Sequence, residues 1–305
     1  MIKGKISSKK EIFLHISQKK KIIPSKFHYD YEGSKYFEKI TKTKEYYVAR
    51  IEKNLLKTIS KEINKIFGKN LTFIEFGSGS IEKISHLISK NVKYYVPLDI
   101  SFDFIKLSSK KLSKIHPHLK IIPQYCDYIK YINLPKTISK KKIGFFLGSS
   151  IGNFYNNEEK TFLKNAKKTL GKNGYLFIGV DLVKSIKVLE KAYNDKTKFT
   201  EKFNLNVINR VNKELNIKLK IKDFKYIASY NKVKKCMENY IISKKEQKFK
   251  IYNKEICIKK NEKIQTEISN KFTIRKFKKL AIESGWKSTK FWVDKKKYYA
   301  IFLLR

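Results

Sequence analysis

A glycine turn that follows a short apolar run is the feature that most constrains the fold of this chain. Residues 71–76 are apolar and β-rich, and Gly77 and Gly79 come directly after them. Glycine lets the backbone turn sharply and lets a ligand approach where a Cβ would exclude it. About 20 residues further on, Asp99 ends a second apolar run, where a carboxylate can accept hydrogen bonds from both hydroxyls of a ribose. The pattern predicts a strand, a turn and a helix that together hold a nucleoside.

The details of the turn decide between the ligands that such a unit can bind. A Gly-x-Gly pair by itself is also typical of an ordinary strand-to-helix turn, and the spacing to Asp99 argues against that reading. The loop reads Gly-Ser-Gly-Ser-Ile-Glu-Lys and lacks the third glycine of the dinucleotide fingerprint. A pyrophosphate is therefore not the expected ligand, and S-adenosylmethionine fits better.

Apolar runs continue to alternate with helical patterns through the first half of the chain. Residues 121–127, 143–147 and 175–180 read as buried strands, and amphipathic stretches at 103–115 and 158–170 separate them. Strands that alternate with helices predict a parallel, doubly wound sheet. Ligands of such sheets lie outside the carboxyl ends of the strands.

The C-terminal segment completes the pattern with a hairpin. Residues 273–284 look helical, and two β-rich runs follow at 289–293 and 298–304 with a turn at 294–297. Such a hairpin would close the edge of the sheet. Five alternating strands and a final antiparallel pair resemble the class I methyltransferases. We expect an α/β fold with a Rossmann-like doubly wound sheet and a C-terminal antiparallel hairpin, plus a second, smaller α+β substrate-binding lobe.

The second lobe is expected where the alternating pattern is interrupted. Residues 183–271 separate the fifth strand from the C-terminal helix, and residues 1–50 also lie outside the repeating unit. We therefore assign 51–182 and 272–305 to the S-adenosylmethionine-binding domain, and 1–50 and 183–271 to the substrate-binding lobe. A chain of 305 residues is long enough to bury a full core, and we expect a monomer.

Export and membrane signals are not apparent. No apolar run is long enough to span a bilayer, and residues 1–23 are interrupted by lysines where a signal peptide would be apolar. The cysteines are odd in number and far apart, which predicts neither a disulfide framework nor a metal site. They are Cys126, Cys236 and Cys257. We expect a cytoplasmic protein.

A pair of histidines is the one feature that suggests a metal. His116 and His118 are separated by a single proline, but other ligand types do not lie near them in sequence. We interpret the pair as loop histidines and expect no metal.

The positive charge raises the question of a polyanionic partner. Lysine and arginine number 70 against 27 acidic residues, a formal net charge of +43. The guanidinium group of arginine is the usual bidentate partner of bases and phosphates. The chain has only four arginines, Arg50, Arg210, Arg275 and Arg305. The lysines are spread through every segment, as A/T-rich codon usage would produce. We expect a solvated lysine coat that binds polyanions non-specifically and in a salt-sensitive way, with no specific nucleic acid partner.

Four further motifs indicate a family. Residues 26–34, 45–52, 146–154 and 203–212 resemble the ergothioneine-pathway L-histidine Nα-methyltransferases. The Gly-Ser-Ser-Ile-Gly-Asn-Phe loop and the Phe-Asn-Leu-Asn-Val block are specific, whereas most methyltransferases share the glycine turn. Val48-Ala49 stands where the family usually has Pro-Thr. The resemblance implies methyl transfer from S-adenosylmethionine to the α-amino group of free L-histidine, up to Nα-trimethylhistidine (hercynine).

The resemblance also implies roles for the residues around the cofactor. Gly77 and Lys83 match the positions at the methionine moiety, and Asp99 matches the ribose acid. Asp127 and Tyr128 match the adenine-binding pair, where a carboxylate can accept from an exocyclic amine and a ring can stack on a purine. A lysine at the start of a helix is also common on the surface of such a lysine-rich chain. The sequence therefore leaves open whether Lys83 is a cofactor residue or an ordinary surface residue.

The α-amino acid end of the acceptor is assigned in the same way, to a pocket built from both lobes. The resemblance implies that Asn153 and Tyr193 bind the α-carboxylate, and that Tyr29 and Tyr46 line the amine and the imidazole. Tyr46 and Asn153 are the catalytic candidates. The acceptor amine must be neutral, and the sequence shows no dedicated base. Tyr46, or a water held by Asn153 and Tyr29, would relay the proton. On an aromatic-rich chain, Tyr46 and its neighbour Tyr47 also read as core residues.

Three further residues are implied to read the side chain of the acceptor. Glu267 and Ser269 would bind the imidazole, and Met237 would pack against the ring. A carboxylate suits an imidazole N–H, and its burial beneath an apolar side chain would be costly. By pattern alone, Glu267 and Ser269 alternate on a strand and read as a solvent-facing edge.

Two other functions remain open at this point. A methyltransferase of the same family could act on an indole amino acid, although an indole has a single donor and would favour an apolar wall over Glu267 and Met237. An RNA-associated methyltransferase or a basic binding module would use the lysines, and clustering of lysines at the pocket mouth would favour it.

Overall fold

The computed structural model describes residues 7–305, which divide into two compact units. The smaller unit comprises residues up to Glu45 together with Ile186–Ile268, and the larger unit comprises Tyr46–Ser185 and Ser269–Arg305. The sequence places the divisions after residues 50, 182 and 271. Tyr46 and Ser269, assigned by sequence to the substrate-binding lobe, therefore belong to the larger unit. Residues 1–6, assigned to the same lobe, lie outside the described residues.

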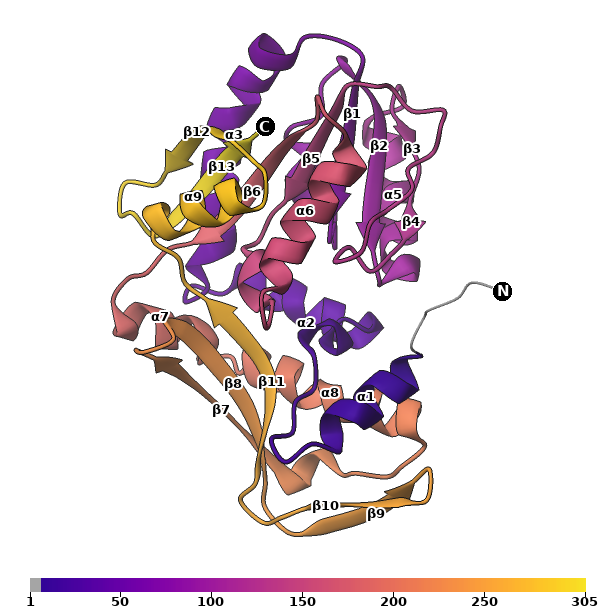
Figure 1. Cartoon of the computed structure of the whole chain (residues 1–305), viewed down its shortest axis with the longest axis vertical. Helices are drawn as coiled ribbons and strands as arrows, with labels where there is room; N and C mark the ends of the chain where they lie inside the picture. The colour runs from indigo at the N-terminus through magenta and orange to yellow at the C-terminus, as the bar shows by residue number, and fades with distance from the viewer. Residues whose placement is uncertain (1–6) are drawn as a thin grey trace. The chain divides into compact units, whose positions relative to one another are not determined.

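The larger unit contains a mixed sheet with the expected order. Its strands follow each other in space as β12-β13-β6-β5-β1-β2-β3, and β4 pairs with β2 (Figure 1). Strand β1 runs parallel to its neighbours β2 and β5, and β5 runs parallel to β6. Strand β13 is antiparallel to both β6 and β12. The doubly wound sheet with its C-terminal hairpin is confirmed. The bounds are β1 Leu71–Phe76, β2 Val92–Asp99, β3 Lys120–Ile121, β4 Gln124–Tyr125, β5 Lys142–Phe146, β6 Tyr175–Asp181, β12 Ser288–Val293 and β13 Tyr299–Leu304.

The third strand differs from its prediction. The sequence predicts one buried strand over residues 121–127, but the structure shows two two-residue pieces, β3 and β4, which are only partly buried. Pro123 lies between them. Proline has no N–H to donate to a ladder, so it interrupts the pairing with β2.

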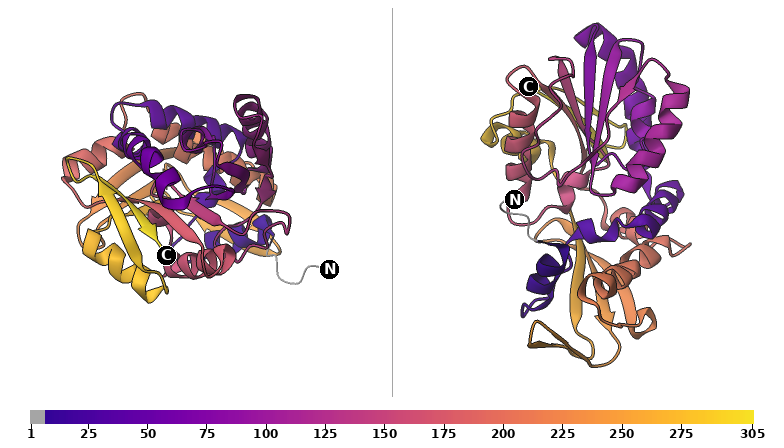
Figure 2. Two further views of the ribbon diagram at one scale, coloured as in Figure 1. Left: turned by 90° about the horizontal axis from the view of Figure 1, so that it is seen from above. Right: turned by 90° about the vertical axis from the view of Figure 1, so that its right-hand side faces the viewer.

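Helices cover both faces of this sheet. Figures 1 and 2 show α6 and α9 on one face and α3 and α5 on the other. The helices predicted at 103–115, 158–170 and 273–284 are confirmed, and Thr273 caps α9 by accepting from the Lys276 backbone N–H at 3.1 Å. The bounds are α3 Tyr47–Phe67, α4 Glu82–Ser85, α5 Phe102–Ile115, the 3₁₀ turn η2 Ser150–Asn153, α6 Glu158–Leu170 and α9 Ile274–Glu283.

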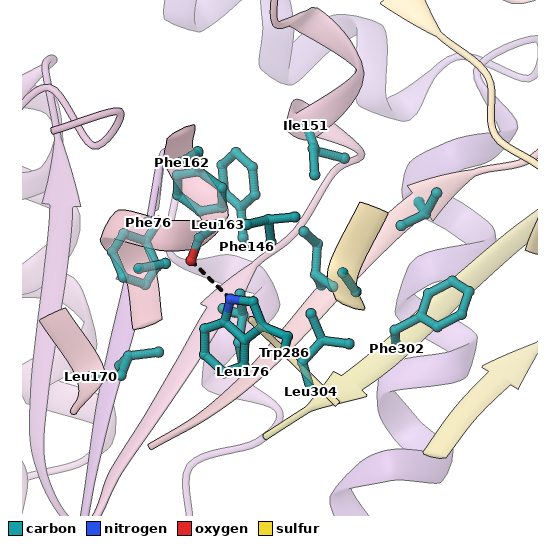
Figure 3. Close-up of a cluster of buried hydrophobic side chains, with 14 of the residues drawn as sticks. Phe76, Phe146, Ile151, Phe162, Leu163, Leu170, Leu176, Trp286, Phe302 and Leu304 are labelled. Atoms are coloured by element: carbon teal, nitrogen blue, oxygen red, sulfur yellow. Dashed lines mark hydrogen bonds between the residues drawn. The ribbon is translucent and has the colours of Figure 1, made fainter. Parts of the chain in front are cut away.

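Aromatic side chains fill the core beneath α6 and α9. Phe146 and Phe162 have ring centroids 4.1 Å apart, and Trp286 donates its indole N–H to the Leu163 carbonyl at 2.8 Å (Figure 3). Phe145 points to the opposite face, because successive strand side chains alternate, and its ring lies 4.8 Å from that of Phe73. Strands buried on both faces explain the nearly continuous apolar runs in the sequence.

The smaller unit is an α+β lobe. A three-stranded sheet has the order β11-β8-β7, β9 and β10 form a separate hairpin, and α8 supplies Val207 and Ile208 to a core with Ile241 and Ile264. The bounds are α1 Ser8–Ile16, η1 Ser25–His28, α2 Tyr31–Lys42, α7 Ile186–Tyr193, α8 Phe199–Leu215, η3 Ile221–Asp223, β7 Phe224–Asn231, β8 Cys236–Ser243, β9 Gln247–Ile251, β10 Lys254–Ile258 and β11 Lys263–Asn270. Among the residues from 7 onward, no helix is long and apolar enough to cross a membrane.

Candidate functional site

The glycine turn after β1 adopts a backbone that favours glycine. Gly77 and Gly79 have φ angles of +67° and +52°, and the Gly77 N–H donates to the Leu98 carbonyl at 2.8 Å. A Cβ on Gly77 would lie 3.2 Å from the ring of Tyr128, whereas a Cβ on Gly79 would meet nothing within 4 Å. The turn therefore packs against Tyr128 on one side and leaves space beside Gly79.

Asp99 closes the turn from the end of β2. Its carboxylate accepts from the Gly79 N–H at 3.0 Å and from the Ser101 N–H at 2.9 Å. The side chain is buried, and burial raises the pKa of Asp99, although these backbone N–H groups act in the opposite direction. Each carboxylate oxygen has a second lone pair, so Asp99 can hold the turn and still accept from a ligand hydroxyl.

Asp127 and Tyr128 follow β4, and the Tyr128 ring lies against the glycine turn. The Asp127 carboxylate accepts from the Ile129 N–H at 3.3 Å, and the Tyr128 ring lies edge-on to Phe146 with centroids 5.3 Å apart. Burial raises the pKa of Tyr128, so its hydroxyl stays protonated. A glycine turn with adjacent space, a buried carboxylate and an aromatic ring fit the nucleoside of S-adenosylmethionine.

Lys83 is held by an acid that the sequence analysis did not single out. Glu52, which is fully buried on α3, forms an ion pair with Lys83 at 2.7 Å and accepts from the Gly148 N–H at 2.7 Å and from the Tyr299 hydroxyl. Glu52 thus joins α3 to the loops that follow β1 and β5. Lys83 is not an ordinary surface lysine, and its partner is specific.

A second buried charge cluster lies at the end of β6. The Asp181 carboxylate forms ion pairs with Lys184 and Lys271 and accepts a hydrogen bond from the Tyr47 hydroxyl. Burial raises the pKa of Asp181, but the two ammonium groups outweigh it and hold that pKa below its usual value. Burial lowers the pKa of Lys184 to about 8. Tyr47 is the tyrosine that enters this cluster, and the catalytic candidate Tyr46 is half-buried immediately before α3.

The loop after β5 brings Asn153 close to Ser269. Asn153 ends η2, and the Asn270 amide donates to the carbonyls of Gly152 and Phe154 at 3.0 and 3.2 Å. A Cβ on Gly152 would lie 3.4 Å from the Ser269 hydroxyl, and that hydroxyl accepts from Lys271 at 2.8 Å. The loop that carries Asn153 therefore lies against the segment that carries Ser269.

Met237 and Glu267 lie on adjacent strands of the smaller unit. Met237 on β8 is fully buried, and Glu267 on β11 is only 8% exposed. The Asn239 amide donates to the Glu267 carboxylate at 2.6 Å. The alternative reading of Glu267 and Ser269 as a solvent-facing edge is wrong. Burial along β11 changes phase between Thr266 and Glu267, so that both of these residues are buried.

The two remaining predicted residues occupy other elements of the smaller unit. The ring of Tyr29 lies 5.4 Å from Phe203 and 5.6 Å from Phe37. Tyr193 ends α7 and is 8% exposed, and its carbonyl accepts from the Tyr226 hydroxyl at 3.0 Å. Both tyrosines are packed in place by contacts within the unit.

The comparison with known proteins decides the family. Residues 8–305 match the family described as histidine-specific methyltransferase, SAM-dependent. The chain belongs to this family. It is 28% identical to a histidine N-alpha-methyltransferase from Mycolicibacterium smegmatis, over 90% of this chain and 87% of that protein, and 24% identical to one from Mycobacterium tuberculosis, over 95% and 92%. It is also 26% identical to an L-tryptophan methyltransferase from Psilocybe serbica, over 93% and 88%.

Membership makes the chain an S-adenosylmethionine-dependent methyltransferase, as the glycine turn and Asp99 predict. Sequence reasoning within the family missed Glu52 and Asn239. The sequence did not mark Asn239, because its strand also contains the polar residues Glu238 and Ser243.

The histidine pair and the cysteines form no metal site in the part of the chain from residue 7 onward. His116 and His118 have ring centroids 5.9 Å apart, and no group of three ligand side chains is present among the described residues. Cys126, Cys236 and Cys257 are free thiols.

Proposed function

We propose that this methyltransferase acts on the α-amino group of free L-histidine, up to Nα,Nα,Nα-trimethylhistidine (hercynine), in ergothioneine biosynthesis. The observation that carries the proposal is the buried carboxylate of Glu267, on the strand next to that of the buried Met237, in a chain of the histidine-specific family. A buried carboxylate is stable when donors bond to it, and an imidazole N–H is such a donor.

The donor side of the reaction is assigned to residues of the larger unit. S-adenosylmethionine supplies an activated methyl group on a sulfonium. We assign its ribose to Asp99, its adenine to Asp127 and Tyr128, and its methionine part to Gly77 and Lys83. These side chains orient the donor and need to do no covalent chemistry, because an in-line displacement depends mainly on distance and alignment.

The acceptor side takes its roles from the family resemblance. We assign the α-carboxylate to Asn153 and Tyr193, because an amide and a phenol can donate to it without adding charge. Tyr29 and Tyr46 line the amine, and Tyr46 relays its proton. The imidazole is read by Glu267, with Ser269 as a further hydrogen-bonding group and Met237 as the apolar contact.

The proposal extends to the setting in which the enzyme works. We propose a monomer in the cytoplasm, with the smaller unit as the substrate-binding lobe and a free amino acid as its partner. The lysine coat then binds polyanions without specificity, and its positive charge plays no part in the methyl transfer.

The test is incubation of the purified protein with S-adenosylmethionine and a panel of free amino acids, with an RNA pool as a separate arm. Mass spectrometry with fragmentation locates the added methyl groups. We expect up to three methyl groups on the α-nitrogen of histidine. Methylation of the imidazole ring, preference for tryptophan, or equal activity on RNA would contradict the proposal.

A further inference from the structure

Asn239 has an unusual environment for a strand residue. Its side chain is fully buried, the amide N–H donates to Glu267 at 2.6 Å, and the amide oxygen has no hydrogen-bond partner among the described residues. Asparagine oxygen and nitrogen are interchangeable in shape, but a carboxylate partner accepts only from the NH₂ group, which fixes the orientation.

Packing does not explain this asparagine. Its neighbours two positions away on β8, Met237 and Ile241, are buried and apolar, so a leucine would suit the same position. A buried amide oxygen without a partner destabilises the fold, and such a group in a native protein calls for an explanation. The explanation is found in what the amide nitrogen holds, which is the carboxylate proposed to read the acceptor.

The backbone of Asn239 is fixed as well. The Thr266 hydroxyl lies 3.3 Å from the Asn239 carbonyl and 2.7 Å from the Asn204 amide oxygen on α8, and the Asn204 amide donates to the Thr200 carbonyl at 3.0 Å. All of these groups lie within the smaller unit. Hydrogen bonds therefore connect Asn239 through Thr266 to α8, and the Asn239 amide in turn bonds Glu267.

We propose that Asn239 is a positioning residue that determines the specificity of the acceptor site by fixing the carboxylate of Glu267. This inference rests on the proposed function. A short bond from an amide N–H favours the ionised carboxylate and restricts its rotation, so the group meets an imidazole N–H at a set angle. The amide oxygen adds an acceptor to the same buried region, which disfavours apolar aromatic side chains further.

The first test replaces the amide by an apolar group of similar size. In Asn239→Leu we expect kcat/KM for histidine to fall about 10- to 100-fold, mostly through KM, the fold equivalent of a lost hydrogen bond to a charged group. The value for tryptophan should fall less or rise, and the Kd for S-adenosylmethionine should not change. Ser243→Ala is the matched control, since Ser243 is a fully buried polar residue of the same strand. It should leave the histidine-to-tryptophan ratio unchanged.

The second test keeps the shape and changes the charge. Asn239→Asp places a second carboxyl group at hydrogen-bond distance from Glu267, and two such groups share one proton. The pH dependence of the KM for histidine should then differ from that of the wild type in the neutral range, because the substrate titrates equally in both proteins and the carboxyl pair only in the variant. This variant also answers the question if Asn239→Leu does not fold.

The outcomes separate the inference from the proposed function. A wild-type enzyme without activity on histidine refutes the proposed function, and the inference with it. An active wild type whose histidine-to-tryptophan ratio is unchanged in Asn239→Leu overturns the inference alone, as does an Asn239→Asp variant with a wild-type pH profile. A lowered ratio, or a pH profile of Asn239→Asp that differs from the wild-type profile, supports it.

Discussion

The two units build their candidate sites by different means. In the larger unit, the Asp99 carboxylate accepts a hydrogen bond from the backbone N–H of Gly79, twenty positions away. In the smaller unit, Glu267 bonds a side chain 28 positions away, and Thr266 bonds one 62 positions away. The first arrangement follows from local backbone geometry, and the second exists only in the folded lobe.

The two units also differ in how they stabilise buried charge. Glu52 and Asp181 of the larger unit pair with lysines, whereas Glu267 is bonded by the neutral amide of Asn239. The ion pairs of the larger unit hold loops in place, whereas the amide of Asn239 orients the carboxylate to which it donates. We expect the ion pairs of Glu52 and Asp181 to stabilise the larger unit, and the bond between Asn239 and Glu267 to affect the choice of acceptor.

The largest predicted effect concerns Glu52. Glu52→Ala leaves Lys83 and the Gly148 N–H without their buried acceptor, and we expect the free energy of unfolding to fall by about 3–5 kcal/mol. Affinity for S-adenosylmethionine should fall as well, because the loops after β1 and β5 lose a common anchor. Urea unfolding and calorimetry measure the two quantities. Glu283→Ala, which breaks the exposed pair with Lys160 at 3.1 Å, is the control and should cost under about 1 kcal/mol. Equal losses in both variants would mean that Glu52 has no anchoring role.

A smaller effect is predicted for the pH dependence of stability. Glu75 is buried in β1 and bonded by the Tyr95 hydroxyl, and burial raises the pKa of Glu75 from 4.5 to about 8. The folded state therefore keeps a proton that the unfolded state releases above its lower pKa. Its stabilising effect is complete below pH 4.5 and is lost as the pH rises to about 8.

Glu75→Gln removes this titration. We expect the wild type to lose a few kcal/mol more than Glu75→Gln between pH 4.5 and 8, measured by denaturant unfolding of both proteins at each pH. Groups shared by the two proteins cancel in the difference. Parallel curves would show that Glu75 is ionised in the folded state at neutral pH.

A more modest effect is predicted for Asp99. Asp99→Ala should weaken S-adenosylmethionine binding by about 1–3 kcal/mol, towards the upper value because the N–H groups of Gly79 and Ser101 also lose their acceptor. Asp99→Asn, which keeps the shape, should lose less. The histidine-to-tryptophan ratio should be unchanged in both variants, because Asp99 is assigned to the donor and not to the acceptor. Calorimetry that finds wild-type affinity in Asp99→Ala would refute the ribose assignment.

The fold of the larger unit could be predicted because its signals are local. Strands buried on both faces give apolar runs, amphipathic helices separate them, and glycine and proline mark the turns. The division of the third strand into β3 and β4 could also be predicted, since Pro123 lies inside the run predicted as one strand. The boundaries between the units were less clear, because no glycine- or proline-rich linker marks them.

The acceptor residues could not be predicted from pattern alone. Strict alternation places Glu267 on a solvent-facing edge, but the change of phase after Thr266 buries it, and no residue type in the sequence announces that change. The contacts of Asn239 with Glu267 and of Glu52 with Gly148 join distant segments, so they follow from tertiary packing. Only the family resemblance pointed to Glu267, and it did not point to Asn239 or Glu52.

The most direct test of the account is to measure kcat/KM for histidine and for tryptophan, together with the Kd for S-adenosylmethionine, in the wild type and in Glu267→Ala. We expect the histidine-to-tryptophan ratio to fall by at least about tenfold, the equivalent of one charged hydrogen bond, while the Kd stays at its wild-type value. Adding Met237→Val should enlarge the space for the side chain of the acceptor and lower the ratio further. A ratio that does not fall would place Glu267 outside the acceptor site and contradict its role as the residue that reads the imidazole.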